Sequence, residues 1–269
     1  MDSSLGDKKL VGIVVPTLGL RVEYLLQCLQ SVRAIEAAHI LLVAPVQAHE
    51  ALQAYSKFFD QLEDDPGTGL AAAINHGVKK LPRHIEIFNW LGDDDLLLED
   101  GFEKSFEEIS SNLNCVATFG ISKFIDENGE VFSKSNLGKH AVQLLLIGPN
   151  KIPQPGALIR RSTFSAMGGL KTDLGWAFDY DMFIRLSRLG QVTFIQEQVS
   201  KYRWHPNSLS AGQTRNSILE ASRVRRDNLP GLLRLCSLIW EIPHVALAIL
   251  LSKRLTNLAV RNTKSQVDK

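Results

Sequence analysis

The feature that most constrains this chain is an apolar run, residues 85–91, that ends abruptly in Gly92 and the aspartates Asp93, Asp94 and Asp95. A short apolar run that ends at a turn signal is typical of a buried β-strand. Carboxylates grouped at the end of a buried strand repel one another unless a cation lies between them. In open α/β sheets, ligands bind just outside the carboxyl ends of the strands. Since Mg²⁺ commonly takes one or two carboxylates together with phosphate oxygens, the run predicts a divalent cation that carries a phosphorylated ligand.

The same aspartates have a simpler interpretation, as a solvated acidic turn that caps the next helix. Residues 96–102 could begin a helix, and the helix dipole favours Asp near a helix N-terminus. An EF-hand calcium loop is excluded because position 97 is Leu rather than an oxygen ligand.

Apolar runs alternate with helical patterns through the first half of the chain. Strands are expected at residues 10–15, 40–44 and 85–91, and helices at 25–32, 47–62 and 70–80, with a breaker-rich loop at 63–69. Such alternation predicts an α/β fold whose sheet is parallel and doubly wound.

The second half of the chain has a different pattern. Strands are expected at residues 115–120, 157–160 and 192–203, a hairpin around Asn128-Gly129, an amphipathic helix at 179–190 and helical structure from about residue 215. We expect a disordered N-terminus at 1–9, a main domain at 10–214 and a basic helical extension at 215–269.

Composition limits the classes of function. The 269-residue chain is 45% hydrophobic and carries a net charge of +1, which argues against a general nucleic-acid-binding protein. Residues 215–269 hold ten Lys/Arg and four Asp/Glu, so this tail is about +6 and suits an anionic partner. The three scattered cysteines fit a reducing compartment. With no secretory signal or membrane-spanning run recognised, we expect a cytoplasmic protein.

Three other groups of residues are candidates for chemistry, and each has a simpler interpretation. Asp179 could be a general base or an N-cap. Gly67 and Gly69 could allow close approach of a ligand, or could form a flexible linker. Arg203 and His205 could hold phosphate and metal, or could be structural. The chain lacks both GxGxxG and GxxxxGK[ST], so neither a dinucleotide fingerprint nor a P-loop is present.

Taken together, these segments resemble a family 2 glycosyltransferase of the GT-A fold. The resemblance spans roughly residues 10–210, and it is carried by the order and spacing of residues 14–17, 65–67, 73–77, 91–95, 154–156, 178–181, 185 and 202–210. It implies a Rossmann-like, mixed but mostly parallel sheet flanked by helices, with a nucleotide-binding half at about 10–120 and an acceptor half at about 121–214.

The resemblance also implies roles for individual residues. Asp179 matches the general base of inverting members. The metal, Mg²⁺ or Mn²⁺, would be held by Asp94, Asp95 and His205. The nucleotide-sugar donor would be contacted by Pro16, Thr17, Asp65, Gly67, Asp93, Gln154, Asp181 and Arg203.

Two departures from the family pattern stand out. The motif that usually opens with an acid has Gly92 instead, which shifts the expected ligands to the three aspartates after it. The second strand usually ends in acidic residues but here ends in Ala44-Pro45, so recognition of the base must differ.

The expected function is metal-assisted, inverting transfer of a sugar to a hydroxyl, in polysaccharide or glycoconjugate synthesis. The acceptor would be a saccharide or lipid-linked, and the basic tail would touch anionic lipid at the inner face of the membrane; the alternative for the tail is a helix packed on the domain. Two other functions stay open, a nucleotidyltransferase and a non-catalytic scaffold that binds a partner.

Overall fold

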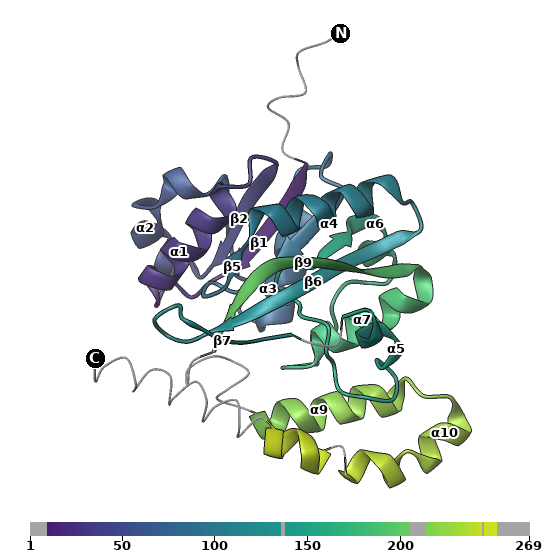
Figure 1. Cartoon of the computed structure of the whole chain (residues 1–269). Coiled ribbons are helices and arrows are strands. Elements are labelled where there is room, and N and C mark those ends of the chain that lie inside the picture. Colours follow the sequence, from purple (N-terminus) through teal and green to yellow (C-terminus); the bar gives the residue numbers. More distant parts are fainter. Residues whose placement is uncertain (1–9, 136–137, 205–213, 244, 252–269) are drawn as a thin grey trace.

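The computed structural model describes residues 10–135, 138–204, 214–243 and 245–251 (Figure 1). The predicted disorder of residues 1–9 and the predicted role of His205 lie outside the described residues. One sheet runs through the described chain, with helices on both of its faces.

The sheet is mixed, as the resemblance implied. Its order is β3-β2-β1-β4-β8-β6-β9-β5, with β7 beside β6. In chain order the strands are β1 Val11–Pro16, β2 Ala38–Ala44, β3 Gln61–Asp64, β4 Ile87–Trp90, β5 Leu96–Leu97, β6 Cys115–Ile125, β7 Val131–Lys134, β8 Leu158–Arg160 and β9 Gln191–Arg203. Neighbouring strands within the group β1 to β4 are parallel, whereas β8 is antiparallel to both β4 and β6. The carboxyl ends of β1 to β4 therefore meet at one edge.

Two layers of helices cover the sheet, and each layer buries its own apolar core. The helices are α1 Val22–Arg33, α2 Val46–Gln53, α3 Leu70–Lys80, α4 Glu99–Ser111, α5 His140–Gln143, α6 Arg161–Ala166, α7 Phe178–Leu189, α9 Thr214–Asp227 and α10 Gly231–Cys236, with a 3₁₀ turn at Ser56–Phe58. One core joins α1 and α4 to the sheet, and the other joins α3, α6 and α7 to its opposite face. Successive residues of β1 and β2 alternate between the two cores, because successive strand side chains point to opposite faces.

The helix expected at residues 47–62 was wrong in its second half. The helix α2 ends at Gln53, and Gln61–Asp64 forms the edge strand β3, paired in parallel with β2. Asp60 joins this segment to β2, because its carboxylate accepts the backbone N–H of Ile40 at 2.8 Å. The hairpin around Asn128-Gly129 is confirmed by the antiparallel pairing of β6 with β7 and by the positive φ of 88° at Gly129.

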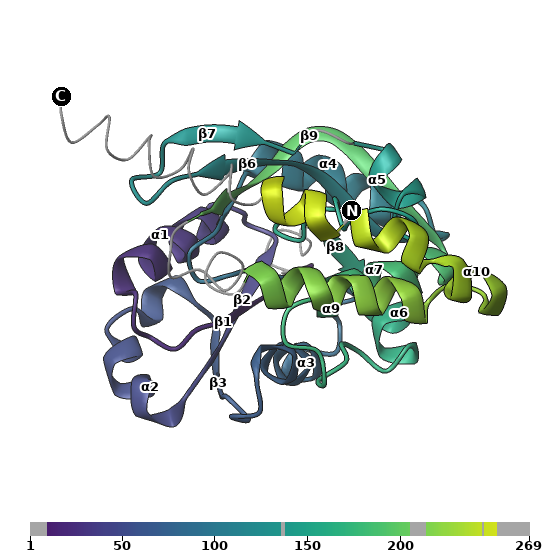
Figure 2. The ribbon, with the colours of Figure 1, turned by 90° about the horizontal axis from the view of Figure 1, so that it is seen from below.

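The C-terminal extension packs closely on the main domain through α9 (Figure 2). The Glu220 carboxylate accepts the backbone N–H groups of Gly175, Trp176 and Ala177, at 3.0, 2.6 and 2.6 Å. Arg225 is buried, and it pairs with the buried Glu241 and donates to the carbonyl of Gly148. No helix among the described residues is long and apolar enough to cross a membrane.

The ion pair between Arg225 and Glu241 should hold this extension in place. Arg225→Met leaves a buried carboxylate without its charged partner, and such a loss typically costs about 3–5 kcal/mol. We expect the free energy of unfolding, measured with urea, to fall by about 3 kcal/mol. The exposed Arg223 on the same helix serves as the control, and Arg223→Met should cost less than about 0.5 kcal/mol. Equal effects of the two substitutions would contradict the assignment.

Candidate active site

The ends of β1 and β4 place Thr17 beside the aspartate turn. The two strands are parallel neighbours, with Val14 opposite Trp90. The Thr17 hydroxyl donates to Asp93 Oδ2 at 2.7 Å, and both side chains are buried. The structure therefore brings together two segments, 76 residues apart, that the sequence had assigned to one site.

Gly92 gives the aspartate side chains room at the start of the turn. The backbone N–H of Asp95 donates to the carbonyl of Gly92 at 3.1 Å and closes the turn. A Cβ atom on Gly92 would lie only 2.9 Å from Asp94 Oδ1 and 3.0 Å from Asp95 Oδ2. A larger residue at position 92 would therefore require the side chains of Asp94 and Asp95 to shift.

Arg21, which the sequence analysis did not single out, bridges two of the aspartates. Its Nη2 atom lies 2.7 Å from Asp93 Oδ1, and its Nη1 atom lies 2.8 Å from Asp94 Oδ2. Arg21 immediately precedes α1, in the connection that leaves β1. The cation that three grouped carboxylates require is thus present in the chain itself.

Arg203 holds the turn from the protein interior. Its backbone N–H donates to Asp95 Oδ1 at 2.9 Å, and its Nε donates to the carbonyl of Asp94 at 3.0 Å. The guanidinium is buried over the ring of Tyr24. Its remaining hydrogen bonds go to the carbonyls of Asp126 and Glu127 and to the side chain of Gln27. These contacts position the turn, and the expected contact of Arg203 with a diphosphate stays a prediction.

Burial raises the pKa of two of the three aspartates. At Asp93 burial is opposed by the Thr17 hydrogen bond and by the charge of Arg21, with a net raised pKa. At Asp95 burial is the larger cause and the charge of Asp94 the next, so that the pKa lies well above its ordinary value. The turn is thus short of positive charge, and a further cation would favour its ionised form.

The turn fits a hard divalent cation in part. Among the residues that the structure describes, no three His, Cys, Asp or Glu side chains are grouped as metal ligands. Asp93 Oδ1 and Asp94 Oδ2 nevertheless converge on one cationic group, and two carboxylates suffice for Mg²⁺ when phosphate and water complete its shell. Asp95, the other expected ligand, is buried and bonded to Arg203. A metal on the first pair would take the place of the Arg21 guanidinium.

Asp179 is the second residue of α7 and does not occupy the N-cap position, which is Ala177. Glu220 binds the N–H groups of Trp176 and Ala177, which precede the helix. The half-buried Asp179 accepts the Asn150 side-chain amide at 3.1 Å and the Tyr180 backbone N–H at 2.7 Å. Burial raises its pKa to about 6. A carboxyl group that titrates near neutrality and accepts only neutral donors in these contacts can take up a proton.

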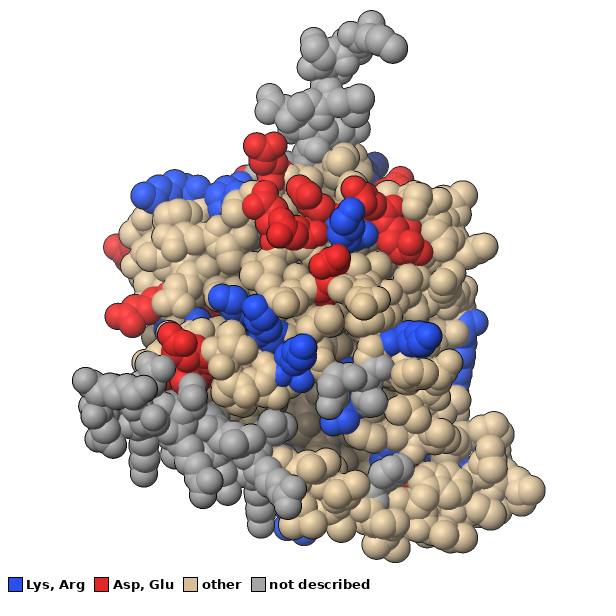
Figure 3. Space-filling model, in the orientation of Figure 1, with Lys and Arg blue, Asp and Glu red and all other residues tan. Residues whose placement is uncertain are grey.

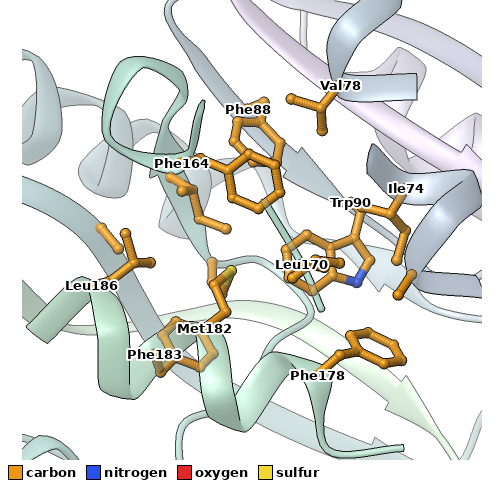
Figure 4. Close-up of a cluster of buried hydrophobic side chains, with 14 of the residues drawn as sticks. Ile74, Val78, Phe88, Trp90, Phe164, Leu170, Phe178, Met182, Phe183 and Leu186 are labelled. Carbon is orange, nitrogen blue, oxygen red and sulfur yellow. The ribbon is translucent and has the colours of Figure 1, made fainter. Parts of the chain in front are cut away.

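Trp90 lies between the aspartate turn and the start of α7. This residue ends β4, and its ring packs on that of Phe178, with centroids 6.5 Å apart (Figure 4). The Gln154 side-chain amide donates to the carbonyl of Trp90 at 2.6 Å. These contacts hold Gln154 and Phe178, the first residue of α7, against the end of β4.

Four other residues predicted to contact the substrate lie in the described part of the chain. Pro16 ends β1. Asp65 follows β3 at the same edge of the sheet, and its Oδ1 accepts the N–H of Gly67, which has a φ of 72°. Asp181 is fully buried between Lys171 and Arg185, each at 2.6 Å. Since both carboxylate oxygens of Asp181 meet cations of the protein, its contact with substrate stays a prediction.

Solved structures establish the fold of this chain. Residues 1–349 of TarS from S. aureus, in complex with UDP-GlcNAc, match with a TM-score of 0.63 over 84% of this chain and 69% of that chain, at 11% sequence identity. The mannosyltransferase PcManGT from Pyrobaculum calidifontis, in complex with GDP-Man and Mn²⁺, matches with a TM-score of 0.61 over 97% of this chain and 80% of that chain, at 13% identity. No protein-family model and no curated protein matches the sequence. The described chain has a GT-A-like fold, a mixed α/β sheet flanked by helices and followed by C-terminal helices.

Proposed function

We propose that this protein is a glycosyltransferase that moves a sugar from a nucleoside-diphosphate donor to an acceptor hydroxyl with inversion. The observation that carries the proposal is the acidic turn at the carboxyl ends of β1 and β4, joined through Trp90 to a carboxyl group with a pKa of about 6. The solved structures that share the fold include one with UDP-GlcNAc and one with GDP-Man and Mn²⁺.

The acidic turn would face the diphosphate of the donor. Asp94 would bind Mg²⁺ or Mn²⁺ together with Asp93 or Asp95, and His205 is the remaining proposed ligand. When bound, the metal acts as a Lewis acid that stabilises negative charge on the leaving diphosphate. Thr17 holds Asp93 in place, and Pro16, Asp65 and Gly67 would contact the nucleoside.

Asp179 would act as the general base. In its ionised form it takes the proton of the acceptor hydroxyl as that oxygen bonds to the anomeric carbon. The bond from the anomeric carbon to the phosphate oxygen breaks on the opposite face, and the nucleoside diphosphate leaves with the electron pair. Asn150 orients the carboxylate through its hydrogen bond at 3.1 Å. A positioned base of this kind typically contributes about 10²–10⁴-fold to the rate.

The C-terminal extension would dock the protein on anionic lipid. Four residues at helical spacing, Leu232, Leu235, Ile239 and Ile242, are between 70% and 80% exposed, and we call them the apolar face. The opposite side of the same segment buries Ser237 and Glu241. The surface around α10 carries few charged groups, whereas acidic side chains gather over α4 (Figure 3).

Charge favours a membrane over a second copy of the chain as the occupant of the apolar face. Arg234 is the exposed charged residue among the described residues 231–243, and the sequence that follows, 252–269, holds five Lys/Arg and one Asp. Apolar residues together with a basic segment suit the surface of an anionic bilayer. An acceptor carried on a lipid would then lie near the active site.

The donor can be identified by thermal denaturation with UDP-, GDP- and TDP-linked sugars, with and without Mn²⁺. A donor at 100 times its Kd should stabilise the folded protein by about 2.7 kcal/mol, since it binds that state alone. We expect one nucleotide class to raise the Tm in Mn²⁺, and Asp94→Ala to abolish the shift while the exposed Asp100→Ala keeps it. Absence of any shift in the wild type would favour the scaffold, and pyrophosphate as the product would favour the nucleotidyltransferase.

Asp179 gives the protein a distinctive dependence on pH. Its pKa in the folded protein, about 6, lies above the ordinary 3.8, so the folded state binds this proton more tightly than the unfolded state. Ionised Asp179 therefore destabilises the protein above pH 6, and this cost disappears as the pH falls toward 4. Allowing for partial exposure, Asp179→Asn should raise the free energy of unfolding by about 2 kcal/mol at pH 8 and leave it unchanged near pH 4.

Ionisation of Asp179, which lowers the stability of the protein, should raise the rate of catalysis. The base must be ionised, so kcat should fall as the pH drops below about 6, and Asp179→Asn should lower kcat by at least about 100-fold. The exposed Asp173→Asn, from the loop before α7, should alter neither stability nor kcat. A stable Asp179→Asn variant that keeps full activity would exclude Asp179 as the base.

Sedimentation with lipid vesicles tests the apolar face. Wild-type protein should sediment with vesicles containing phosphatidylserine or phosphatidylglycerol and stay in solution with pure phosphatidylcholine. Leu235→Glu with Ile239→Glu should abolish sedimentation, whereas Leu113→Glu, at an equally exposed position after α4, should not. If the double variant instead dissociates a dimer seen by light scattering, the apolar face belongs to a second copy of the chain.

A further inference from the structure

We propose that Arg21 is an internal cation that competes with the divalent metal for Asp93 and Asp94, and that it pairs with the donor diphosphate once displaced. This inference rests on the proposed function, because it concerns how the same acidic turn receives its ligands. It assigns a role to a residue outside the motifs that carry the family resemblance.

The bonds of Arg21 place its guanidinium across the turn. One terminal nitrogen lies 2.7 Å from Asp93 Oδ1 and the other 2.8 Å from Asp94 Oδ2, so a single group joins two different carboxylates. A metal that takes these two oxygens would have to occupy the same space. The two cations would also repel each other, which makes their binding to the pair mutually exclusive.

The turn is fixed, whereas Arg21 is its solvent-facing partner. Thr17 holds the carboxylate of Asp93, and Arg203 holds the backbone of Asp94 from the interior. The side chain of Arg21 is 36% exposed, against 9% for Asp93 and 13% for Asp94. An arginine side chain has several rotatable bonds, and an outward rotation would uncover both oxygens while the turn keeps its shape.

Competition by Arg21 weakens the binding of the metal by an amount that can be calculated. The apparent Kd rises by the inverse of the fraction of molecules in which the binding site is open. If Arg21 occupies the carboxylates in about nine molecules out of ten, Mn²⁺ binds about tenfold more weakly than it would to the open turn. The metal-free protein in turn avoids two uncompensated carboxylates at a buried strand end.

The displaced guanidinium would have a new partner when the donor is present. Guanidinium groups match phosphate oxygens in geometry and charge. The diphosphate would lie on the metal at the turn, within the reach of a side chain that has just left it. The bound metal should therefore raise the affinity of the protein for the donor. Linkage requires that the bound donor raises the affinity for the metal by the same factor.

Binding measurements on the purified protein test this role directly. Arg21→Met keeps most of the side-chain volume and removes the charge. We expect it to bind Mn²⁺ alone about tenfold more tightly by electron paramagnetic resonance, and to bind UDP or GDP in saturating Mn²⁺ about tenfold more weakly by calorimetry. Effects of opposite sign on metal and nucleotide distinguish competition from general damage to the site.

Arg33→Met is the matched control. Arg33 ends the same helix, has a similar exposure of 31% and pairs with Asp60 at 3.3 Å. Its replacement should leave both affinities unchanged. Arg21→Lys, which keeps the charge but loses the two-nitrogen bridge, should give intermediate values, and it replaces Arg21→Met if that variant does not fold.

Unchanged or weaker binding of Mn²⁺ by Arg21→Met would overturn the competition. Unchanged nucleotide affinity would overturn the pairing with the diphosphate. These outcomes are separate from the proposed function, whose failure is the absence of any nucleotide-dependent rise in the Tm of the wild type. Tighter Mn²⁺ binding by Arg21→Met would support the competition even in that case.

Discussion

The site depends on one constraint. The negative charges of three carboxylates, grouped at the buried end of β4, must be compensated by nearby groups. Thr17 binds Asp93 from β1, Arg203 binds Asp95 and the backbone of Asp94 from β9, and Arg21 closes the outer side. These partners come from two distant parts of the chain, the connection that follows β1 and the end of β9. The turn therefore keeps its charges close together only when the central sheet is assembled, which couples the site to the fold.

Much of the central fold could be predicted because its signals are local. The apolar runs that form β1, β2 and β4 match their sequence patterns, and the parallel order follows from the helices between them. The same order explains why Thr17 and Asp93, each just after a strand, meet at one edge of the sheet. The edge strand β3 was missed because Gln61–Asp64 is short and polar, and its identity depends on pairing with β2 rather than on its own pattern.

The partners of the site residues could be predicted less well, because they arise from distant contacts. Nothing near Arg21 in sequence indicates that its guanidinium meets Asp93 and Asp94, more than 70 residues away. The surroundings of Asp179 also depend on distant residues, since Asn150 binds its carboxylate and Glu220 in α9 binds the N–H groups of Trp176 and Ala177 just before the helix. The usable signal was electrostatic: grouped carboxylates require a cation, and a search for arginines near the end of the adjacent strand would have found Arg21.

The C-terminal extension is part of the site's support rather than an appendage. Glu220 fixes the segment that leads into α7, and Arg225 binds the hydroxyl of Tyr180, the residue next to Asp179. The same Arg225 pairs with Glu241, which lies on the segment that carries the apolar face. A contact that shifts this segment would act on the start of α7 through buried hydrogen bonds. The extension thus offers a direct physical path by which attachment to a surface could affect the position of the proposed base.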